Sequence, residues 1–592
     1  MKSIKGKGIV RNLYPFLWRA AVVFFVAVIS ACGGGGGGGS SNPPPQDGLS
    51  VDKTTLIFTG EEGQSVASQS ITGSITGATG PVILKIAYTN QGIQFVTFTQ
   101  LTPTRGRVDV TPQPTVALAP GSYSDTITVY ACYDAGCTQP VTGSPKRVSV
   151  SYMIQPRNPP PTLLLSDHGV AFASVPSGAH LTRTLSARDS TGAASTWSAT
   201  SNESWLTVTG SGNSSGFLML SANPVGLPDG SYEARVTVTS SNPAIAKSET
   251  VRVGLYVSAA ASADRFSQTP SNNWVVDPIR PLAYSTSGSQ VAIDHVFTGA
   301  RTGSINVPGA TLARVVVGDD GSRLYAQDNA NRAIVVIDLD TRQVVNSLGF
   351  PQFVFDGFYT FDKMRMNYAR VHGTSVLIFN TAQVPLGMTT RFISPVVNAE
   401  TGEMAGELFY ITSPFTGLFT VSRDGNVLYA GETDLSGILP VARVELRANS
   451  VGNVYGIRTA EQGFNESSTL EIATNEDGSR VFVSFFSDLF VRALSFDGTA
   501  LIESNSLAPY TIPGNVFLIG AAPQNVEVDP YGRIITALST FDFRLYSSNE
   551  TLVQESTNLP VASIGSTETG ALRISSDGLR AMGNGYLIDL LP

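Results

Sequence analysis

The sequence predicts an all-β protein, with two immunoglobulin-like β-sandwiches followed by a seven-bladed β-propeller. Three observations lead to this prediction. The composition is typical of an exported β protein, one strand motif occurs twice in the first half of the chain, and one glycine turn recurs seven times in the second half. Short strands separated by turn residues are the pattern of sandwiches and propellers.

The composition narrows the classes of protein. The chain has 592 residues and a net charge of −8, and only 14% of its residues are charged. This length allows three or four domains. It has no basic run or arginine–aromatic patch, which argues against a nucleic-acid partner. The four histidines show neither H-x-H nor H-E-x-x-H spacing, so we expect no zinc enzyme, no metal site and no cofactor.

The first 31 residues have the pattern of a secretory signal peptide. A basic segment precedes an apolar run at 20–29, which is shorter than the roughly 20 residues that span a bilayer. The stretch ISAC at 29–32 resembles the bacterial lipobox. This resemblance implies cleavage before Cys32 and attachment of lipid to its thiol and new amine. The alternative is an ordinary signal peptide cut nearby, with Cys32 incidental.

Residues 32–47 are predicted to be a flexible tether. Seven glycines and two serines follow Cys32, and Gly/Ser runs behave as flexible coils. By the same resemblance, Gly33 rather than aspartate after the cysteine implies the outer membrane of a Gram-negative cell. The membrane is therefore an expected partner, in a leaflet that the sequence does not specify.

Proline runs and small residues divide the rest of the chain into domains. The run NPPP occurs at 42–45 and again at 158–161, and such runs favour extended, semi-rigid spacers. The stretch SAAASA is a further linker. The predicted parts are a first sandwich over 48–156, a proline-rich linker over 157–162, a second sandwich over 163–257, a linker over 258–263 and a propeller over 264–592.

The two sandwiches share a strand motif. LAPGSYSDTITV at 118–129 matches LPDGSYEARVTV at 227–238, with an offset of 109 residues. Each module then ends in an alternating strand, at 148–154 and at 251–257. Alternation with a period of two predicts a strand with one buried face. The two modules are therefore predicted to have the same fold.

Two further cysteines lie in the first module. Cys132 and Cys137 are separated by four residues, and an exported chain meets an oxidising compartment, so the sequence predicts a disulfide. Residues 133–136 would form the tip of a hairpin. The alternative is a redox-active C-x-x-C pair, which requires two intervening residues rather than four.

The second module contains the stretch WSATSNESWLTVTG at 197–210. With its flanks, from about 163 to 257, it resembles the BACON family of bacterial β-sandwich domains, and the first module shows a weaker resemblance. The resemblance implies carbohydrate or mucin binding as an expectation. Trp197 and Trp205 could form a sugar-stacking platform, but tryptophans more often fill the core of a small β domain, and we expect a core role.

A glycine turn recurs through the second half of the chain. Copies such as VGDDGSRLYA at 317–326 and VSRDGNVLYA at 421–430 place a tight turn between two apolar strands. The stretch 331–345 adds two more strands, so that one repeat would be a four-stranded blade. The shared glycines are Gly288, Gly321, Gly373, Gly425, Gly478, Gly532 and Gly578.

The spacing of these glycines predicts seven blades. They lie 33, 52, 52, 53, 54 and 46 residues apart, and the chain ends soon after the last. The final blade would therefore lack an outer strand, and we expect the segment 274–276 to supply it and close the ring. VVIDLDTRQVVNSL at 335–348 resembles the YVTN and quinoprotein-like propellers of bacterial surface proteins. This resemblance is typical of the fold and not of one activity.

Three motifs could carry chemistry, and each has an ordinary structural explanation. GNSSG at 212–216 matches the nucleophile elbow of hydrolases, but a predicted strand follows it instead of a helix. The aromatic segment 350–361 could line a binding groove or pack between blades. Several carboxylates could bind calcium, although aspartate is common in turns: Asp319, Asp320, Asp338, Asp340 and Asp424.

Together these features predict a lipid-anchored protein of the bacterial cell envelope. Its sandwiches would form a stalk, and its propeller would bind a polysaccharide or an envelope protein through a loop face, with or without the second sandwich. The alternatives are a scaffold for envelope assembly and a propeller enzyme, either a quinoprotein-like dehydrogenase or a lactonase. Because fold does not imply function and no catalytic constellation is recognisable, an enzyme is the less favoured class.

Overall fold

The structure is a computed structural model of the whole chain, and it describes residues 21–23, 28–29 and most of 48–592. The described residues form β-strands joined by turns, so the protein is all-β. They include no helix that is long and apolar enough to cross a membrane. After residue 48 the description omits 79, 116–117, 119–120, 156–160, 191–195, 211–215, 269–273, 351–360, 362–363, 381, 387–388, 409–417, 432–438, 449–453, 465–468, 486–490, 508–522, 539–542, 557–572 and 584–585.

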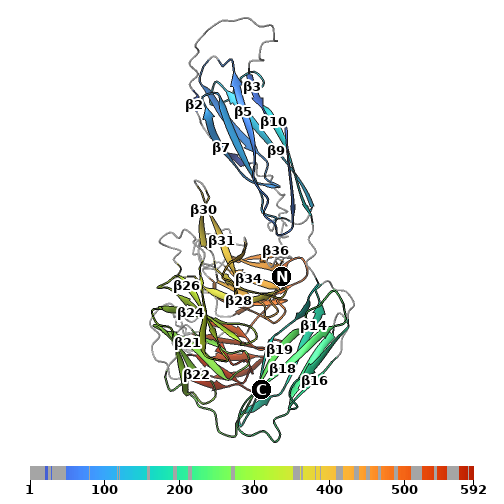
Figure 1. Cartoon of the computed structure of the whole chain (residues 1–592), viewed down its shortest axis with the longest axis vertical. Coiled ribbons are helices and arrows are strands. Elements are labelled where there is room, and N and C mark those ends of the chain that lie inside the picture. The colour runs from blue at the N-terminus through green and yellow to red at the C-terminus, as the bar shows by residue number, and fades with distance from the viewer. Residues whose placement is uncertain are drawn as a thin grey trace, which may run out of the picture. The chain divides into compact units, whose positions relative to one another are not determined.

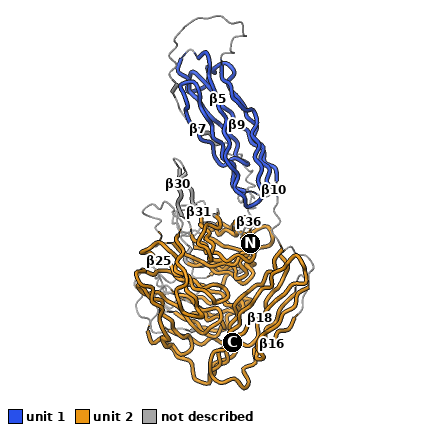
Figure 2. Tube along the Cα trace, in the orientation of Figure 1, with its two compact units in different colours: residues 1–157 blue, residues 158–592 orange. Residues whose placement is uncertain are grey.

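The chain divides into two compact units, residues 1–157 and 158–592 (Figure 2). The first unit contains the first module, whose strands are drawn in blue in Figure 1. Its two sheets have the orders β4–β10–β9–β6 and β3–β5–β8–β7, with β1 and β2 paired to β6. The strands are β1 Ala21–Val23, β2 Val28–Ile29, β3 Gly48–Val51, β4 Thr55–Glu61, β5 Gln69–Thr76, β6 Val82–Tyr88, β7 Ile93–Thr102, β8 Arg105–Pro112, β9 Gly121–Cys132 and β10 Lys146–Gln155.

Strict alternation along the strands builds the core of the first module. In β10, Val148, Val150, Tyr152 and Ile154 are buried, and the residues between them are exposed. Successive side chains of a strand point to opposite faces, so one face enters the core. The Tyr152 ring meets the edge of Phe58 from the parallel neighbour β4, with ring centroids 6.1 Å apart. The strand predicted over 148–154 is therefore confirmed.

The second module, residues 163–257, also has two sheets around one core. Their orders are β11–β14–β17–β16 and β13–β12–β19–β18–β15. All pairs are antiparallel except β12 with β19. The strands are β11 Leu163–Leu165, β12 Gly169–Val175, β13 Gly178–His180, β14 Thr182–Asp189, β15 Trp197–Ser201, β16 Leu206–Thr209, β17 Gly216–Ala222, β18 Gly230–Ser240 and β19 Glu249–Val257.

The described residues of 264–592, called here the seven-sheet region, form seven successive antiparallel sheets. The first three contain β20 Trp274–Val276, β21 Leu282–Ser287, β22 Gln290–His295 and β23 Arg301–Asn306; β24 Leu312–Val317, β25 Arg323–Asp328, β26 Ala333–Asp338 and β27 Gln343–Gly349; and β28 Met366–Val371, β29 Thr374–Phe379, β30 Ala382–Leu386, β31 Thr389–Asn398 and β32 Met404–Leu408. In the third sheet, β30 and β32 both pair with β31.

The remaining four sheets follow in chain order. They contain β33 Leu418–Val421, β34 Val427–Gly431, β35 Leu439–Ala448 and β36 Val454–Phe464; β37 Thr469–Thr474, β38 Arg480–Phe485, β39 Val491–Phe496 and β40 Leu501–Ser506; β41 Pro523–Val528, β42 Ile534–Leu538, β43 Phe543–Tyr546 and β44 Leu552–Ser556; and β45 Arg573–Ile574, β46 Arg580–Gly583 and β47 Tyr586–Asp589.

The first strands of neighbouring sheets contact one another in a closed circuit. The contacts run β20–β24–β28–β33–β37–β41–β45 and return from β45 to β20. Apolar clusters fill the space between successive sheets, so each sheet buries both faces. A further cluster joins the last sheet, the first sheet and the second module. Burial of these apolar faces is the main force that holds the sheets together.

Six of the seven recurrent glycines lie at equivalent turns, between the first and second strands of their sheets. All seven have a positive φ, from 60° at Gly288 to 81° at Gly373, a conformation that glycine adopts without a Cβ clash. Gly288 differs because it joins β21 to β22, the second and third strands of the first sheet. The short first interval of the repeat reflects this shift by one strand.

The expected role of segment 274–276 is wrong. Trp274–Val276 forms β20, the first strand of the first sheet, and pairs with β21. The last sheet instead meets the chain just before it, where Arg265 forms a β-bridge with Tyr586 and the Leu587 amide donates to the Asp264 carbonyl at 2.8 Å. The sequence pattern showed a missing outer strand but could not identify so short a replacement.

Candidate binding site

A polar pocket of about 450 Å³ lies between the second and third sheets of the seven-sheet region. Its wall combines residues near the turn between β24 and β25, the outer strand β27, and strands β28 and β29. Pockets of this size accept small molecules or single groups of a larger ligand. The polar lining residues are Asp320, Ser322, Arg323, Tyr325, Asn346, Tyr368, Arg370, Ser375 and Glu400.

The glycine turn fixes the acidic side of the pocket. Gly321 adopts a φ of +66°, and its amide donates to the Gly318 carbonyl at 2.9 Å. Asp320 Oδ1 accepts hydrogen bonds from the Ser322 amide at 2.9 Å and from its hydroxyl at 2.7 Å. The short polar side chains expected in such a turn therefore hold the Asp320 carboxylate in place.

Two arginines line the pocket, and both have carboxylate partners. Arg370 forms a bidentate pair with Asp319, with Nε and a terminal nitrogen each 2.9 Å from a carboxylate oxygen, and lies 3.7 Å from Asp320. Arg323 is paired with Asp338. Bidentate pairing fixes the plane of a guanidinium. The arginine donors are thus positioned while their charges are balanced.

Two tyrosines form an adjoining part of the wall. The rings of Tyr325 and Tyr368 stack with centroids 5.8 Å apart and planes inclined by 20°. The Tyr368 hydroxyl donates to Ser375 Oγ at 2.9 Å. Burial raises the pKa of both phenols, so both remain neutral and can donate or accept a hydrogen bond.

The same wall is connected to the second module. His168 Nδ1 lies 2.9 Å from Asp319 Oδ2, and His168 Nε2 lies 3.6 Å from Glu249. Burial lowers the pKa of His168, but the two carboxylates raise it to about 9, so this histidine is charged at neutral pH. Although burial opposes ionisation of Asp319, His168 and Arg370 hold its pKa well below the usual range. Asp319 therefore joins Arg370 of the pocket to the second module.

The second module contacts turns of six sheets on this face. Each turn links the first and second strands of its sheet. The contacts are ion pairs, a hydrogen bond and a ring contact: Glu233–Arg280, His168–Asp319, Asp167–Arg423, Arg183–Glu476, His180–Tyr531 and His180–Asp577. The contacts are spread over the face, so they fix the orientation of the second module on the seven-sheet region as well as its distance from that region.

Two glycines permit this close approach. A Cβ at Gly254 would lie 1.7 Å from the carbonyl oxygen of Ile279, and one at Gly169 would lie 2.3 Å from that of Asp319. No side chain fits at such distances without movement of the backbone. Residues 163–257 and the seven-sheet region therefore share one compact unit.

The structure places the predicted tryptophans in the core of the second module. Trp197 is 3% exposed and Trp205 is 8% exposed, and both belong to its apolar cluster. Buried rings offer no face to a sugar, so the stacking-platform alternative has no support here. The predicted core role agrees with their position.

The predicted disulfide is present between Cys132 and Cys137, with Cα atoms 5.1 Å apart. Cys132 ends β9, but no return strand begins at Cys137. A single bridge between Cys132 and Pro140 takes its place. Cys32, the predicted lipidation site, lies outside the described residues.

In the part of the chain that is described, the other sequence motifs provide no support for a catalytic or metal site. Residues 212–215 of GNSSG and 351–360 of the aromatic segment lie outside the described residues. Where the structure describes the chain, no cluster of three or more His, Cys, Asp or Glu could hold a metal ion. Among the candidate calcium-binding carboxylates, Asp338 accepts from the Thr341 amide at 2.8 Å and Asp424 accepts from Ser422 Oγ at 2.6 Å, each within its own turn. Asp319 and Asp340 instead pair with arginines from other elements, Asp319 with Arg370 and Asp340 with Arg252 and Arg280.

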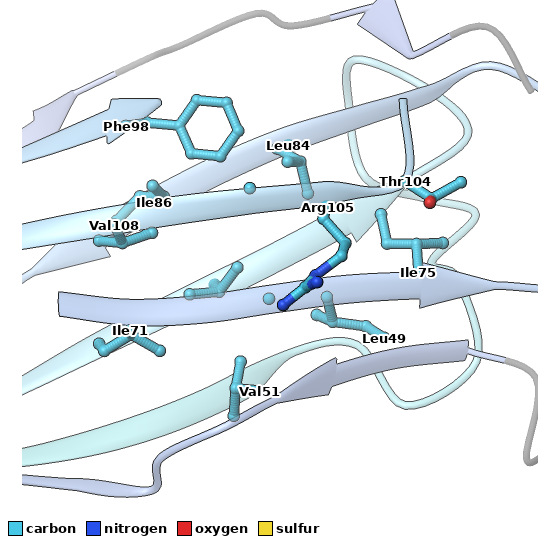
Figure 3. A pocket seen from close by; sticks show the side chains of 13 residues that line it. Leu49, Val51, Ile71, Ile75, Leu84, Ile86, Phe98, Thr104, Arg105 and Val108 are labelled. Atoms are coloured by element: carbon cyan, nitrogen blue, oxygen red, sulfur yellow. The ribbon is translucent and has the colours of Figure 1, made fainter. Parts of the chain in front are cut away.

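The first module has a separate cavity of about 20 Å³, shown in Figure 3. Its labelled side chains, including Leu84, Ile86 and Phe98, converge from both sheets. The lining is almost wholly apolar, and a buried water needs two to four polar partners. This cavity is a dry gap in the core and not a ligand site.

Sequence reasoning missed the residues that make the polar pocket. Asp320 and Arg323 belong to the DDGSR turn, where the aspartate was explained by turn formation alone. Tyr368 and Arg370 precede the degenerate turn at Gly373, in a strand whose packing against the neighbouring sheet could not be read from the sequence. The signal available was the repeat itself, because consecutive repeats form neighbouring sheets, and the facing sides of two such sheets enclose the pocket.

No family model matches the chain, and no curated protein matches it.

Proposed function

We propose that this chain is a lipid-anchored binding protein of the bacterial cell envelope. In this proposal the two sandwiches are immunoglobulin-like, the second is BACON-like, and the seven-sheet region is a seven-bladed β-propeller. The ligand is a polysaccharide or an envelope protein. The sequence features that favour export and anchoring are the signal-like segment, the lipobox-like ISAC and the glycine tether.

The propeller assignment is supported by the order of the strands. Four-stranded antiparallel sheets that follow one another in sequence are the repeating unit of a propeller. The circuit of contacts from β20 to β45 and back would be its ring. The bridge between Arg265 and Tyr586 would complete the last blade with a segment from before the first.

The docking of the second module changes which parts of the chain are expected to form the stalk and which to bind the ligand. The sequence alone suggested that both sandwiches form a stalk. Because the second module belongs to the same compact unit as the seven-sheet region, we assign it to the receptor. The first module and the tether would then separate the receptor from the membrane.

The polar pocket is the observation that carries the binding function. Its 450 Å³ are lined by hydrogen-bonding groups whose positions are fixed by the glycine turn, by the Arg370–Asp319 pair and by the stacked tyrosines. A site in which donors and acceptors are held before the ligand arrives loses less entropy on binding.

The test uses the full-length chain, expressed in a Gram-negative host and extracted in mild detergent. Incorporation of labelled fatty acid that is lost in Cys32→Ser tests the anchor. Saturable binding to envelope polysaccharides or to one envelope protein tests the receptor. Catalytic turnover of the bound material, or failure to bind any envelope component, would overturn the proposal.

A further inference from the structure

The pocket between β24–β27 and β28–β32 is specific enough to indicate the class of its ligand. We propose that it binds an uncharged, hydroxyl-rich sugar residue of a glycan. This inference rests on the proposed function and names the ligand of that same site. It follows from the charge of the lining, from its hydrogen-bonding groups and from the way the pocket opens.

The charge of the lining disfavours an ionic ligand. Arg323 and Arg370 face the pocket, and so do Asp320 and Glu400. Asp319 and Asp338 already neutralise the two guanidinium groups. Among the lining residues that the structure describes, an anion would therefore meet two carboxylates without gaining an unpaired cation, and a cation would meet two guanidinium groups. An uncharged ligand avoids both penalties, which grow where water is partly excluded.

The hydrogen-bonding groups suit a ligand with many hydroxyls. Each sugar hydroxyl can donate one hydrogen bond and accept others, so its site must offer both kinds of partner. The carboxylate of Asp320 accepts, the guanidinium of Arg370 donates, and the Asn346 amide can do both. The hydroxyl of Tyr325 adds a neutral donor, since burial raises the pKa of that phenol.

The same lining disfavours a mainly apolar ligand. Among its described residues, Val336, Val345 and Ala399 are the apolar side chains, whereas most of the described wall is polar. Transfer of an apolar group into this pocket would remove water from polar groups without replacing their hydrogen bonds, and each unreplaced bond is costly. A ligand must therefore bring its own polar groups.

The mouth of the pocket lies at the outer edge of the seven-sheet region. Val345 on strand β27 is 51% exposed, and its neighbour Asn346 and the turn residue Glu400 are also exposed. An open rim allows a bound residue to remain connected to a longer chain. A polysaccharide, which is much larger than 450 Å³, could thus be recognised through one of its residues.

The test measures binding of the full-length chain in mild detergent to immobilised oligosaccharides. The panel pairs neutral gluco-, manno- and xylo-oligosaccharides with uronic-acid oligosaccharides of similar length. Neutral oligosaccharides are expected to bind saturably. Asn346→Ala and Glu400→Gln change exposed groups at the rim, and each should weaken binding by about tenfold, the effect of losing one hydrogen bond to a ligand.

Matched controls separate the pocket from the rest of the surface. Glu403→Gln changes an exposed glutamate in the same turn as Glu400 but outside the lining, and Asn306→Ala changes an exposed asparagine on β23. Both should bind like the wild type. Asn346→Trp places a large ring at the mouth and should reduce binding more than Asn346→Ala does.

The outcomes distinguish this inference from the proposed function. Neutral-glycan binding that is weakened by the rim variants and retained by the controls supports both. Preferential binding of uronic-acid chains, or binding that the rim variants leave unchanged, overturns the inference but leaves an envelope receptor. Failure to bind any glycan, with one envelope protein retained, also overturns the inference. Failure to bind any envelope component overturns the proposed function itself.

Discussion

His168 and Asp319 form a buried ion pair between the second module and the seven-sheet region, with His168 Nδ1 2.9 Å from Asp319 Oδ2. The same carboxylate holds Arg370 in the wall of the polar pocket. One aspartate therefore links module docking to the candidate binding site. Its position in the glycine turn between β24 and β25 brings both partners within reach.

His168→Ala should destabilise the second unit by about 3 kcal/mol, because removal of one partner leaves buried carboxylates with less compensation. Denaturant unfolding of the full chain, followed by hydrogen exchange in residues 158–592, measures the effect. Lys247→Ala is the control, since Lys247 pairs with the same Glu249 at 3.8 Å but is 74% exposed. A loss as small as the control's, under about 1 kcal/mol, would show that the pair is not structural.

Two histidines of the second unit should contribute to its stability with opposite pH dependences on the two sides of pH 6.5. The pKa of His168 is raised to about 9 in the folded protein, compared with 6.5 in the unfolded chain. Its contribution to the free energy of unfolding is therefore complete below pH 6.5 and is lost as the pH rises towards 9. Burial lowers the pKa of His295 to about 4, so its neutral form contributes above pH 6.5 and this contribution is lost as the pH falls towards 4.

Unfolding free energies measured between pH 4 and pH 10 check both signs. His168→Gln should remove the decline above pH 6.5 and leave the decline below it. A variant that keeps the full decline above pH 6.5 would exclude His168 as its source.

Gly254→Ala should weaken docking by about 3 kcal/mol, because the new Cβ would lie 1.7 Å from the Ile279 carbonyl oxygen and must push the two parts apart. Gly349→Ala is the matched control, since a Cβ there meets no atom within 4 Å. Its stability should stay within about 0.5 kcal/mol of the wild type. Limited proteolysis and denaturant unfolding would detect the difference, and equal stability of the two variants would refute the close approach.

The disulfide should stabilise only the first unit. Closing so short a loop contributes about 2 kcal/mol in the chain-entropy model. The double variant Cys132→Ser, Cys137→Ser should lower the unfolding free energy of residues 48–155 by this amount, with residues 158–592 unchanged. Reducing agent should reproduce the loss in the wild type and have no effect on the variant. An additional loss in the second unit would contradict a local role.

Trp197→Ala should cost about 3 to 5 kcal/mol, as expected when a large buried ring is removed from a core. Phe217→Ala in the same module is the control, because Phe217 is 66% exposed. Thermal unfolding compares the two variants. If Trp197→Ala kept wild-type stability but lost glycan binding, Trp197 would be a ligand contact and its burial would be misassigned.

Much of the fold could be predicted from the sequence because local patterns determine it. Alternation predicted the buried face of β10, and six of the recurrent glycine turns were placed between the correct strands. Gly288 was placed in the same repeat, but its turn joins a different pair of strands. The glycine motif indicates a tight turn, but it does not show which two strands of the sheet that turn joins.

The candidate site was much less predictable. Arg370 and Asp320 lie fifty positions apart and meet only because neighbouring sheets pack side by side. His168 comes from another module, and its burial depends on docking. Such long-range contacts leave no local pattern, whereas the tryptophans of the second module were conspicuous in sequence and proved to be core residues.

The measurement that tests the central claim most directly is hydrogen exchange of the full-length chain, with and without a saturating concentration of the neutral oligosaccharide that binds most tightly. A ligand in the polar pocket should slow exchange in peptides that cover 318–325 and 366–378. The effect should extend to the His168 segment through Asp319. Protection confined to the first module, or to sheets that do not border the pocket, would contradict the account.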